Sequence, residues 1–241
     1  MEQVLLGKWT KGLLDRTLIE ASKIKDTGNR IDFLSKHFLN TRYKESTLIG
    51  NIRTPEILVI NLEEVDCFTF IDYIEAMRRS GSYLDFRKNL VNVRYRSGEI
   101  DYKNRNHFFT DWKEFNTGFI VDLTPQIGDG ETESVSRRLN EKEDGTLFLP
   151  GIPCLQRKVE YIPTALSDDT VIAGLKTGDY VGLYSNIKGL DVSHVGIIIM
   201  KGDSVTIRHA SSAAKQRKVL DEDFKNYLAN KPGFVVLRPR D

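Results

Sequence analysis

The stretch that decides the fold is Ile57-Leu58-Val59-Ile60-Asn61-Leu62 with the Asp66-Cys67-Phe68 that follows it. Its first part is apolar and β-branched, which predicts a buried strand over residues 57–62. Apolar residues then recur at three-residue spacing, as on one buried helix face: Phe68, Ile71, Ile74 and Met77. Asp66 is the natural N-cap of this helix, and Ser80-Gly81 is a C-terminal stop. The sequence therefore predicts a strand-to-helix turn with a cysteine at the helix start.

A cysteine in that position is a candidate nucleophile. The unpaired backbone N–H groups of a helix start, and the positive end of its dipole, favour a thiolate over a thiol. We therefore expect Cys67 to react as an anion below the ~8.5 pKa of a free thiol. The structural alternative is a small buried hydrophobic residue, which is the commoner role of a lone cysteine.

Residues 193–211 predict a β-hairpin that carries two histidines. If Gly202-Asp203 is a two-residue turn, His209 lies opposite Gly196 and diagonal to His194. Both rings then share one face at ~7–8 Å, whereas a loop one residue longer would put them on opposite faces. His194 would accept the thiol proton and later protonate the departing amine, while His209 would orient His194.

Four blocks, in this order, resemble the NlpC-type papain-like cell-wall hydrolases: Asp66–Phe70, Thr177–Val181, Ser193–Ile197 and His209–Ser211. Phe38–Tyr43 is similar to the upstream Tyr motif of that superfamily, although Arg42 and Lys44–Ser46 replace the small residues that usually flank the tyrosine. Three further segments resemble its N-acetylmuramoyl-L-alanine amidase-like branch: Val59–Leu62, Arg94–Arg96 and Arg105–Trp112. The resemblance spans most of residues 27–241.

The resemblance implies an α+β, papain-like fold, in which an antiparallel sheet packs against helices. It also implies a cysteine amidase that cuts between N-acetylmuramic acid and L-alanine in peptidoglycan fragments, favouring the 1,6-anhydro form. By position, Cys67, His194 and His209 take the catalytic roles, and Tyr43 lines the site beside the nucleophile. This mechanism requires neither a metal nor a cofactor.

The chain of 241 residues suits one catalytic domain with a small appendage. Residues 1–50 are expected to form an N-terminal helical segment, divided at Gly28 and Asn29. Residues 51–241 are expected to form the catalytic domain, with further strands at 179–184 and 234–237. Between the cysteine helix and the hairpin lies a long insertion, about 81–176, which we expect to build the substrate cleft.

Aromatic and basic residues alternate within this insertion: Tyr95, Tyr102, Phe108 and Trp112 with Arg94, Arg96, Arg105 and His107. Flat rings suit a sugar, and cations suit substrate carboxylates. The candidate substrate-binding residues are Tyr95, Arg105 and Trp112 of this insertion, together with Tyr43, Asp66 and Ser193 of the blocks that resemble the family. For the insertion residues, the structural alternative is a core aromatic or an internal ion pair. Interspersed acidic residues make nucleic-acid binding the poorer interpretation.

Composition bounds the remaining expectations. A net charge of +1 predicts no electrostatic capture of nucleic acid or membrane, and the apolar runs are too short to span a bilayer. Two cysteines without a CxxC motif indicate neither a zinc knuckle nor a disulfide framework, so Cys154 is a packing thiol. Because residues 1–3 lack a basic n-region, the protein is either cytoplasmic or a mature exported form; the implied substrate favours the periplasm. We expect a monomer.

Three functions stay open at this stage. Beside the amidase stand a γ-D-glutamyl-diamino acid endopeptidase of the same superfamily and a non-catalytic muropeptide-binding module. A serine mechanism has no Gly-x-Ser-x-Gly elbow to support it. One cysteine and two histidines could hold zinc with a fourth position left for water, so a metalloamidase also stays open.

Overall fold

The computed structural model describes residues 2–202 and 204–240, and the predicted strand-to-helix turn is confirmed. Strand β3 covers Leu58–Asn61 and helix α3 covers Cys67–Arg78. All helix residues from Thr69 to Arg78 are buried, not only the predicted apolar face. Helix α3 is therefore an interior helix rather than a surface helix with one apolar stripe.

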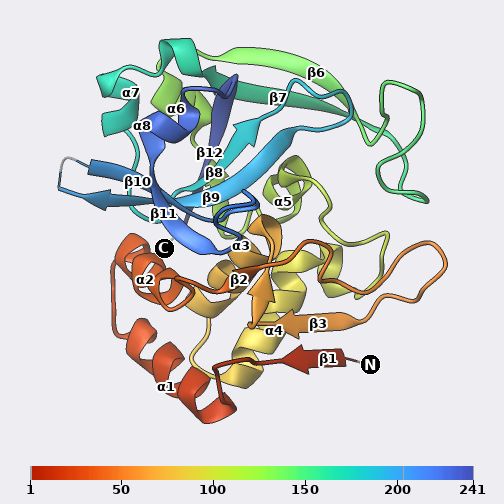
Figure 1. Cartoon of the computed structure of the whole chain (residues 1–241), viewed down its shortest axis with the longest axis vertical. Coiled ribbons are helices and arrows are strands. Elements are labelled where there is room, and N and C mark those ends of the chain that lie inside the picture. The colour runs from red at the N-terminus through yellow and green to blue at the C-terminus, as the bar shows by residue number, and fades with distance from the viewer. Residues whose placement is uncertain (1, 203, 241) are drawn as a thin grey trace. The chain divides into compact units, whose positions relative to one another are not determined.

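The described chain forms two units, residues 2–105 with 208–221 and residues 106–207 with 222–240. Figure 1 labels their elements, and the α+β class expected from the sequence is confirmed. In unit 1 the elements are β1 (Glu2–Leu5), α1 (Lys11–Ser22), α2 (Thr27–Lys36), β2 (Arg42–Tyr43), β3, β4 (Glu64–Val65), α3, α4 (Tyr83–Arg94) and a 3-10 turn (Arg96–Gly98). The domain boundary expected at residue 50 stays a prediction.

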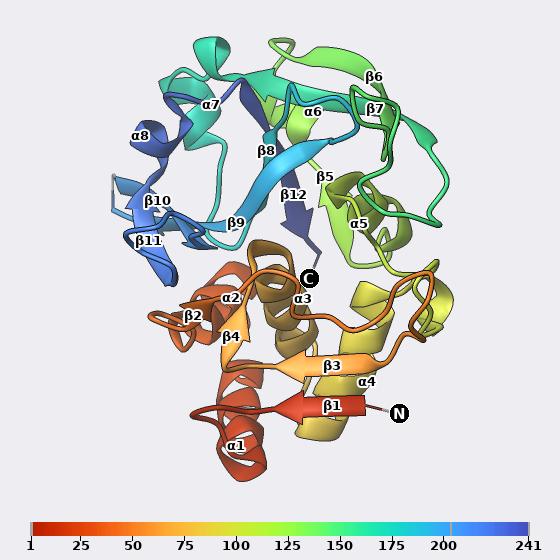
Figure 2. The same ribbon diagram turned by 45° about the vertical axis from the view of Figure 1, so that its right-hand side comes forward.

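The N-terminal segment is less helical than predicted. Strand β1 lies parallel to β3, with Glu2 opposite Leu58, and Figure 2 shows the two strands side by side. Asp26 accepts a hydrogen bond from the backbone N–H of Asn29 at 2.7 Å and so begins helix α2. The expected break at Gly28 and Asn29 is therefore wrong: both lie inside α2, because an N-cap aspartate outweighs the low helix propensity of glycine in a first turn.

Unit 2 is built on antiparallel strand pairs. Strand β12 pairs with β8, β7 and β5, β8 pairs with β9, and β7 pairs with β6. Its elements are α5 (Phe109–Phe115), β5 (Ile120–Asp122), α6 (Thr124–Gly128), β6 (Glu133–Leu139), β7 (Leu155–Pro163), a 3-10 turn (Thr164–Leu166), α7 (Asp169–Ala173), β8 (Tyr180–Tyr184), β9 (Val192–Lys201), α8 (Phe224–Leu228) and β12 (Gly233–Pro239). The long insertion thus contributes β5, β6 and β7 to the sheet.

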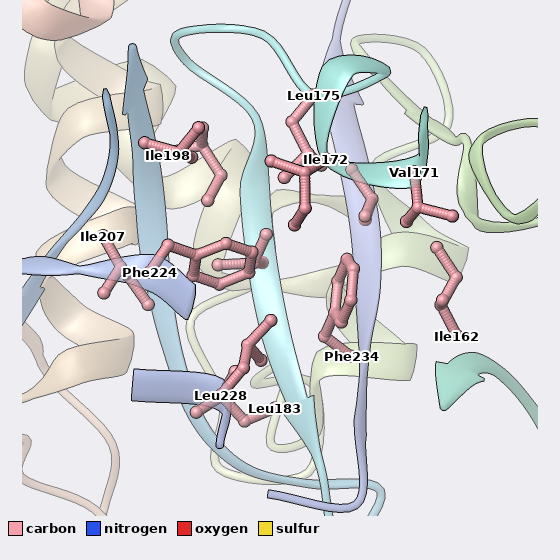
Figure 3. Packing of buried hydrophobic residues seen from close by; sticks show 13 residues of the cluster. Ile162, Val171, Ile172, Leu175, Leu183, Ile198, Ile207, Phe224, Leu228 and Phe234 are labelled. Atoms are coloured by element: carbon pink, nitrogen blue, oxygen red, sulfur yellow. The ribbon is translucent and has the colours of Figure 1, made fainter. Parts of the chain in front are cut away.

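One hydrophobic cluster holds these strands to the short helices (Figure 3). Val171 and Ile172 come from α7, and Phe224 comes from α8. They pack with side chains from strands: Ile162, Val181, Leu183, Ile198, Val205, Ile207, Phe234 and Val236. Alternate residues of β8, β9 and β12 face this cluster, as the two-residue period of a strand requires.

The predicted hairpin is present. Strand β9 ends at Lys201 and β10 (Ser204–Ala210) begins after two intervening residues, while Gly202 has the positive φ of 59° that the turn requires. The Thr206 hydroxyl donates to the Ile199 carbonyl at 3.1 Å, which joins the two strands. Asp203, the other predicted turn residue, lies outside the described residues. Strand β10 continues into unit 1, where β11 (Val219–Asp223) begins.

Candidate functional site

The start of helix α3 is fixed by a capping box. The Asp66 carboxylate accepts from the Thr69 backbone N–H at 2.7 Å, and the Thr69 hydroxyl accepts from the Asp66 backbone N–H at 3.0 Å. Burial raises the pKa of Asp66, and these hydrogen bonds oppose the rise. Cys67 is consequently held at the first helical position, as the sequence predicts.

The link from β3 to this cap is also ordered. The Asn61 side chain accepts from the backbone N–H groups of Glu63 and Glu64 at 3.1 and 3.0 Å. The Asn61 backbone N–H donates to the buried Tyr73 hydroxyl at 2.8 Å, which ties the strand end to α3 itself. The turn that presents Cys67 is thus stabilised from both sides.

The two cysteines lie in different surroundings. Cys67 and Cys154 are both half-buried, and neither is in a disulfide. Cys67 occupies the helix start, whereas Cys154 lies in the segment between β6 and β7. Cys67, unlike Cys154, therefore has the unpaired backbone N–H groups of a helix start beside it, which favour a thiolate.

Tyr43 lies beside the cysteine, as the family resemblance implies. Strand β2 runs parallel to β4 with Tyr43 opposite Val65, two residues before Cys67. Burial, followed by the negative charges of Cys67 and Asp66, raises the pKa of Tyr43 to about 12. The phenol is therefore a protonated hydrogen-bond donor at neutral pH.

Arg217, which sequence reasoning did not single out, contacts Tyr43. The Tyr43 backbone N–H donates to the Arg217 carbonyl at 2.9 Å, and the Arg217 guanidinium carbon lies 4.8 Å from the centre of the Tyr43 ring. Tyr43 and Arg217 are 174 positions apart in the chain, so no local pattern signals this contact, although Arg217 follows the His209-Ala210-Ser211 block closely.

His209 is fully buried near the end of β10, and unit 1 contains both it and Cys67. Its neighbour Arg208 is also fully buried and donates to both carboxylate oxygens of Asp221, at 2.7 and 3.0 Å. The same guanidinium donates to the Asp32 carboxylate and to the Ser35 hydroxyl, each at 2.8 Å. These bonds fix the backbone that carries His209 to α2 and β11, a role that sequence reasoning missed.

His194 belongs to unit 2. It lies on β9 opposite Leu183, where a register shift interrupts the β8–β9 pairing, and it is half-buried. Its ring centre lies 6.1 Å from that of Tyr227 on α8. The neighbouring Ser193 is exposed, and its hydroxyl donates to the Leu183 carbonyl at 3.4 Å. The convergence of His194 and His209 on Cys67 stays a prediction.

An open groove of about 470 Å³ lies next to Tyr227. It is lined by Glu222, Asp223, Asn226, Tyr227, Asn230 and Lys231. The ammonium group of Lys231 lies 5.6 Å from the centre of the Tyr227 ring, so this ring has a cation near it as well as His194.

The start of strand β9 is anchored by a buried carboxylate. Asp191 accepts from the Thr110 backbone N–H at 2.7 Å and from the Thr110 hydroxyl at 2.8 Å. Burial raises the pKa of Asp191, and these hydrogen bonds oppose the rise. Thr110, which belongs to the Arg105–Trp112 block, is therefore buried and supports the strand that carries His194.

The side chains of Tyr95 and Trp112 are buried, and Arg105 is half-buried. The Tyr95 hydroxyl donates to Glu56 at 2.8 Å, and Arg105 pairs with the same carboxylate at 3.3 Å. Burial of this Glu56 raises its pKa, and the Arg105 charge opposes the rise. Trp112 is fully buried and stands edge-on to the Tyr180 ring at 5.1 Å. Tyr95 and Trp112 follow the structural alternative of a core aromatic, and Arg105 follows that of an internal ion pair.

Among residues 2–202 and 204–240, no helix combines the length and the apolarity needed to cross a membrane. Within the same residues, no group of three or more His, Cys, Asp and Glu side chains is arranged to hold a metal ion.

Comparison with known proteins gives a family and several solved structures. The model of the family described as AmiA-like, N-acetylmuramoyl-L-alanine amidase-like, matches residues 33–234. A Legionella pneumophila protein of family DUF1460 is 22% identical with a TM-score of 0.79, over 96% of this chain and 94% of that one. An N-acetylmuramoyl-L-alanine amidase from Bacteroides uniformis is 25% identical with a TM-score of 0.72, over 95% and 99%.

A Bacteroides fragilis protein described as a candidate xylanase is 29% identical with a TM-score of 0.70, over 85% of this chain and 98% of that one. Comparison with curated proteins finds no match.

Proposed function

The chain belongs to the AmiA-like, N-acetylmuramoyl-L-alanine amidase-like family, and on that premise we propose that it is a cysteine amidase of peptidoglycan fragments. The bond cut is the amide between the lactyl group of N-acetylmuramic acid and L-alanine, and the favoured substrate is a soluble 1,6-anhydro-muropeptide. The observation that carries the proposal is Cys67 at the first position of a capped helix, beside the protonated phenol of Tyr43.

The proposed reaction has two steps. His194 takes the thiol proton of Cys67, and the sulfur attacks the lactyl carbonyl carbon; His194 then protonates the leaving amine of L-alanine. This leaves a thioester between Cys67 and the muramic acid. Water, activated by His194, attacks the thioester, and the products are a muramic acid carboxylate and the regenerated thiol. His209 orients His194 through both steps.

The start of α3 also supplies an oxyanion donor. In the proposed geometry the backbone N–H of Cys67 points at the carbonyl oxygen as negative charge develops on it; one such donor lowers the barrier by ~3 kcal/mol. The Tyr43 hydroxyl lines the same corner, and its raised pKa keeps it a donor throughout the range in which a histidine base works. Asp66 acts indirectly, by holding the helix start, and Ser193 is the exposed neighbour of His194.

The location and assembly follow from the proposed substrate. Peptidoglycan fragments are released in the periplasm, so we propose a periplasmic location, with the cytoplasm as the alternative. We also propose that the protein acts as a monomer.

Product analysis tests the proposed bond. A defined anhydro-disaccharide tetrapeptide is incubated with the protein, and the products are identified by mass spectrometry. The amidase predicts disaccharide without peptide together with the free tetrapeptide. An endopeptidase that cuts after γ-D-glutamate would leave the first two amino acids on the sugar, and a glycoside hydrolase would split the disaccharide; either product would contradict the proposal.

Inhibitors separate the thiol from a zinc mechanism. Turnover that survives EDTA and disappears with iodoacetamide supports the thiolate. If no fragment is cleaved and wild type and Cys67→Ala bind the substrate equally, the non-catalytic module replaces the amidase.

A further inference from the structure

The loop that carries Arg217 is built to hold one conformation. The backbone N–H groups of Gln216 and Arg217 donate to the Ala213 carbonyl at 2.8 and 3.0 Å, and the Ser211 backbone N–H donates to the Lys218 carbonyl at 2.9 Å. The backbone of Lys218 also forms an antiparallel β-bridge with that of Arg42 on β2. Arg217 itself has a φ of 43°, a left-handed backbone that residues other than glycine rarely adopt. The loop therefore fixes the backbone from which the Arg217 side chain projects.

The charge of Arg217 has an aromatic partner, but no carboxylate partner among the described residues. Its guanidinium lies over the Tyr43 ring, while the residue stays exposed. Among the described residues, no carboxylate forms an ion pair with it. Two other arginines of unit 1 differ in this respect: Arg208 pairs with Asp32 and Asp221, and Arg105 with Glu56.

The geometry points to a carboxylate subsite, and we propose that Arg217, held over Tyr43, binds a carboxylate of the substrate on the peptide side of the bond that is cut. This inference rests on the proposed function. In a muropeptide stem, L-alanine is followed by a γ-linked D-glutamate, whose α-carboxylate is the first negative charge beyond the scissile amide. A planar guanidinium recognises a carboxylate through two parallel hydrogen bonds, and the contact with the Tyr43 ring holds the Arg217 guanidinium in place.

A pair of substrates tests the subsite. Two anhydro-muropeptides are used that differ only at D-glutamate, which carries either its α-carboxylate or a neutral amide there. Removal of one charge-assisted interaction in Arg217→Ala is expected to lower kcat/KM for the carboxylate substrate ~10-fold, and to leave the amide substrate almost unchanged. Arg217→Lys should recover part of the loss, because lysine keeps the charge but not the paired hydrogen bonds. Lys215→Ala, an exposed cation of the same loop, is the matched control and should behave as wild type.

Equal losses of activity on both substrates would overturn the inference, since they would mean that Arg217 only supports the position of Tyr43. So would full activity of Arg217→Ala on the carboxylate substrate. If wild type cleaves neither substrate, the proposed function fails, and calorimetry still decides the subsite. The probe is then the stem tripeptide L-alanyl-γ-D-glutamyl-diaminopimelate: Arg217→Ala added to Cys67→Ala should weaken its binding ~10-fold, and unchanged affinity would contradict the inference.

Discussion

Replacement of Cys67 with alanine is expected to abolish release of free tetrapeptide from anhydro-muropeptides. Without the thiolate no thioester can form, and loss of a nucleophile that acts together with its base lowers kcat by roughly 10⁴-fold or more. Alanine suits the first position of a helix, and the cap between Asp66 and Thr69 does not involve the thiol. The activity loss should therefore come with an unchanged unfolding transition, measured by circular dichroism.

Cys154→Ala is the matched control, because Cys154 is the second half-buried thiol outside a disulfide. It should keep the activity of wild type. Comparable losses in the two variants would indicate that removal of a thiol disturbs packing in general. Full turnover by Cys67→Ala would refute the cysteine mechanism.

Replacement of Arg208 with alanine is expected to lower the free energy of unfolding by ~3 kcal/mol, since removal of the buried cation leaves two partly buried carboxylates without their partner. Arg208 has 0% side-chain exposure, while Asp32 and Asp221 are only 27% and 18% exposed. The measurement is denaturant unfolding at neutral pH. Strand β10 should loosen at His209, so activity should fall as well.

Arg138→Ala provides the contrast. Arg138 pairs with Glu141 at 3.3 Å, but its side chain is 52% exposed, so the loss should not exceed about 1 kcal/mol. Similar small losses in both variants would mean that the Arg208 network contributes little to the stability of unit 1.

Local signals predicted the core of the fold. The apolar run before Asp66, the N-cap aspartate and the glycine turn at 202 are each decided within a few residues, and the structure has β3, α3 and the hairpin where these signals place them. The family resemblance added the position of Tyr43 beside the cysteine. Strand β1 was not predicted, because its partner β3 lies more than fifty residues away in the sequence and the pattern of a four-residue strand is too short to detect.

The candidate site was predictable only in part, because the rest depends on contacts between distant segments. Aromatic residues such as Tyr95 and Trp112 can stack on a sugar, yet both are buried here: Tyr95 is hydrogen-bonded to Glu56, and Trp112 packs against Tyr180. Arg217 contacts Tyr43, and Arg208 is hydrogen-bonded to Asp32. No spacing rule links residues that lie so far apart in the sequence.

The most direct test is the pH dependence of Cys67 alkylation in Cys154→Ser, where it is the single remaining cysteine. The rate of iodoacetamide modification is followed by intact mass, and hydrolysis is assayed on the same samples. A thiolate stabilised by the helix start and an imidazolium predicts fast modification well below pH ~8.5, with activity lost in step. A rate that rises only near that value, or hydrolysis that persists once every molecule is modified, would contradict the account.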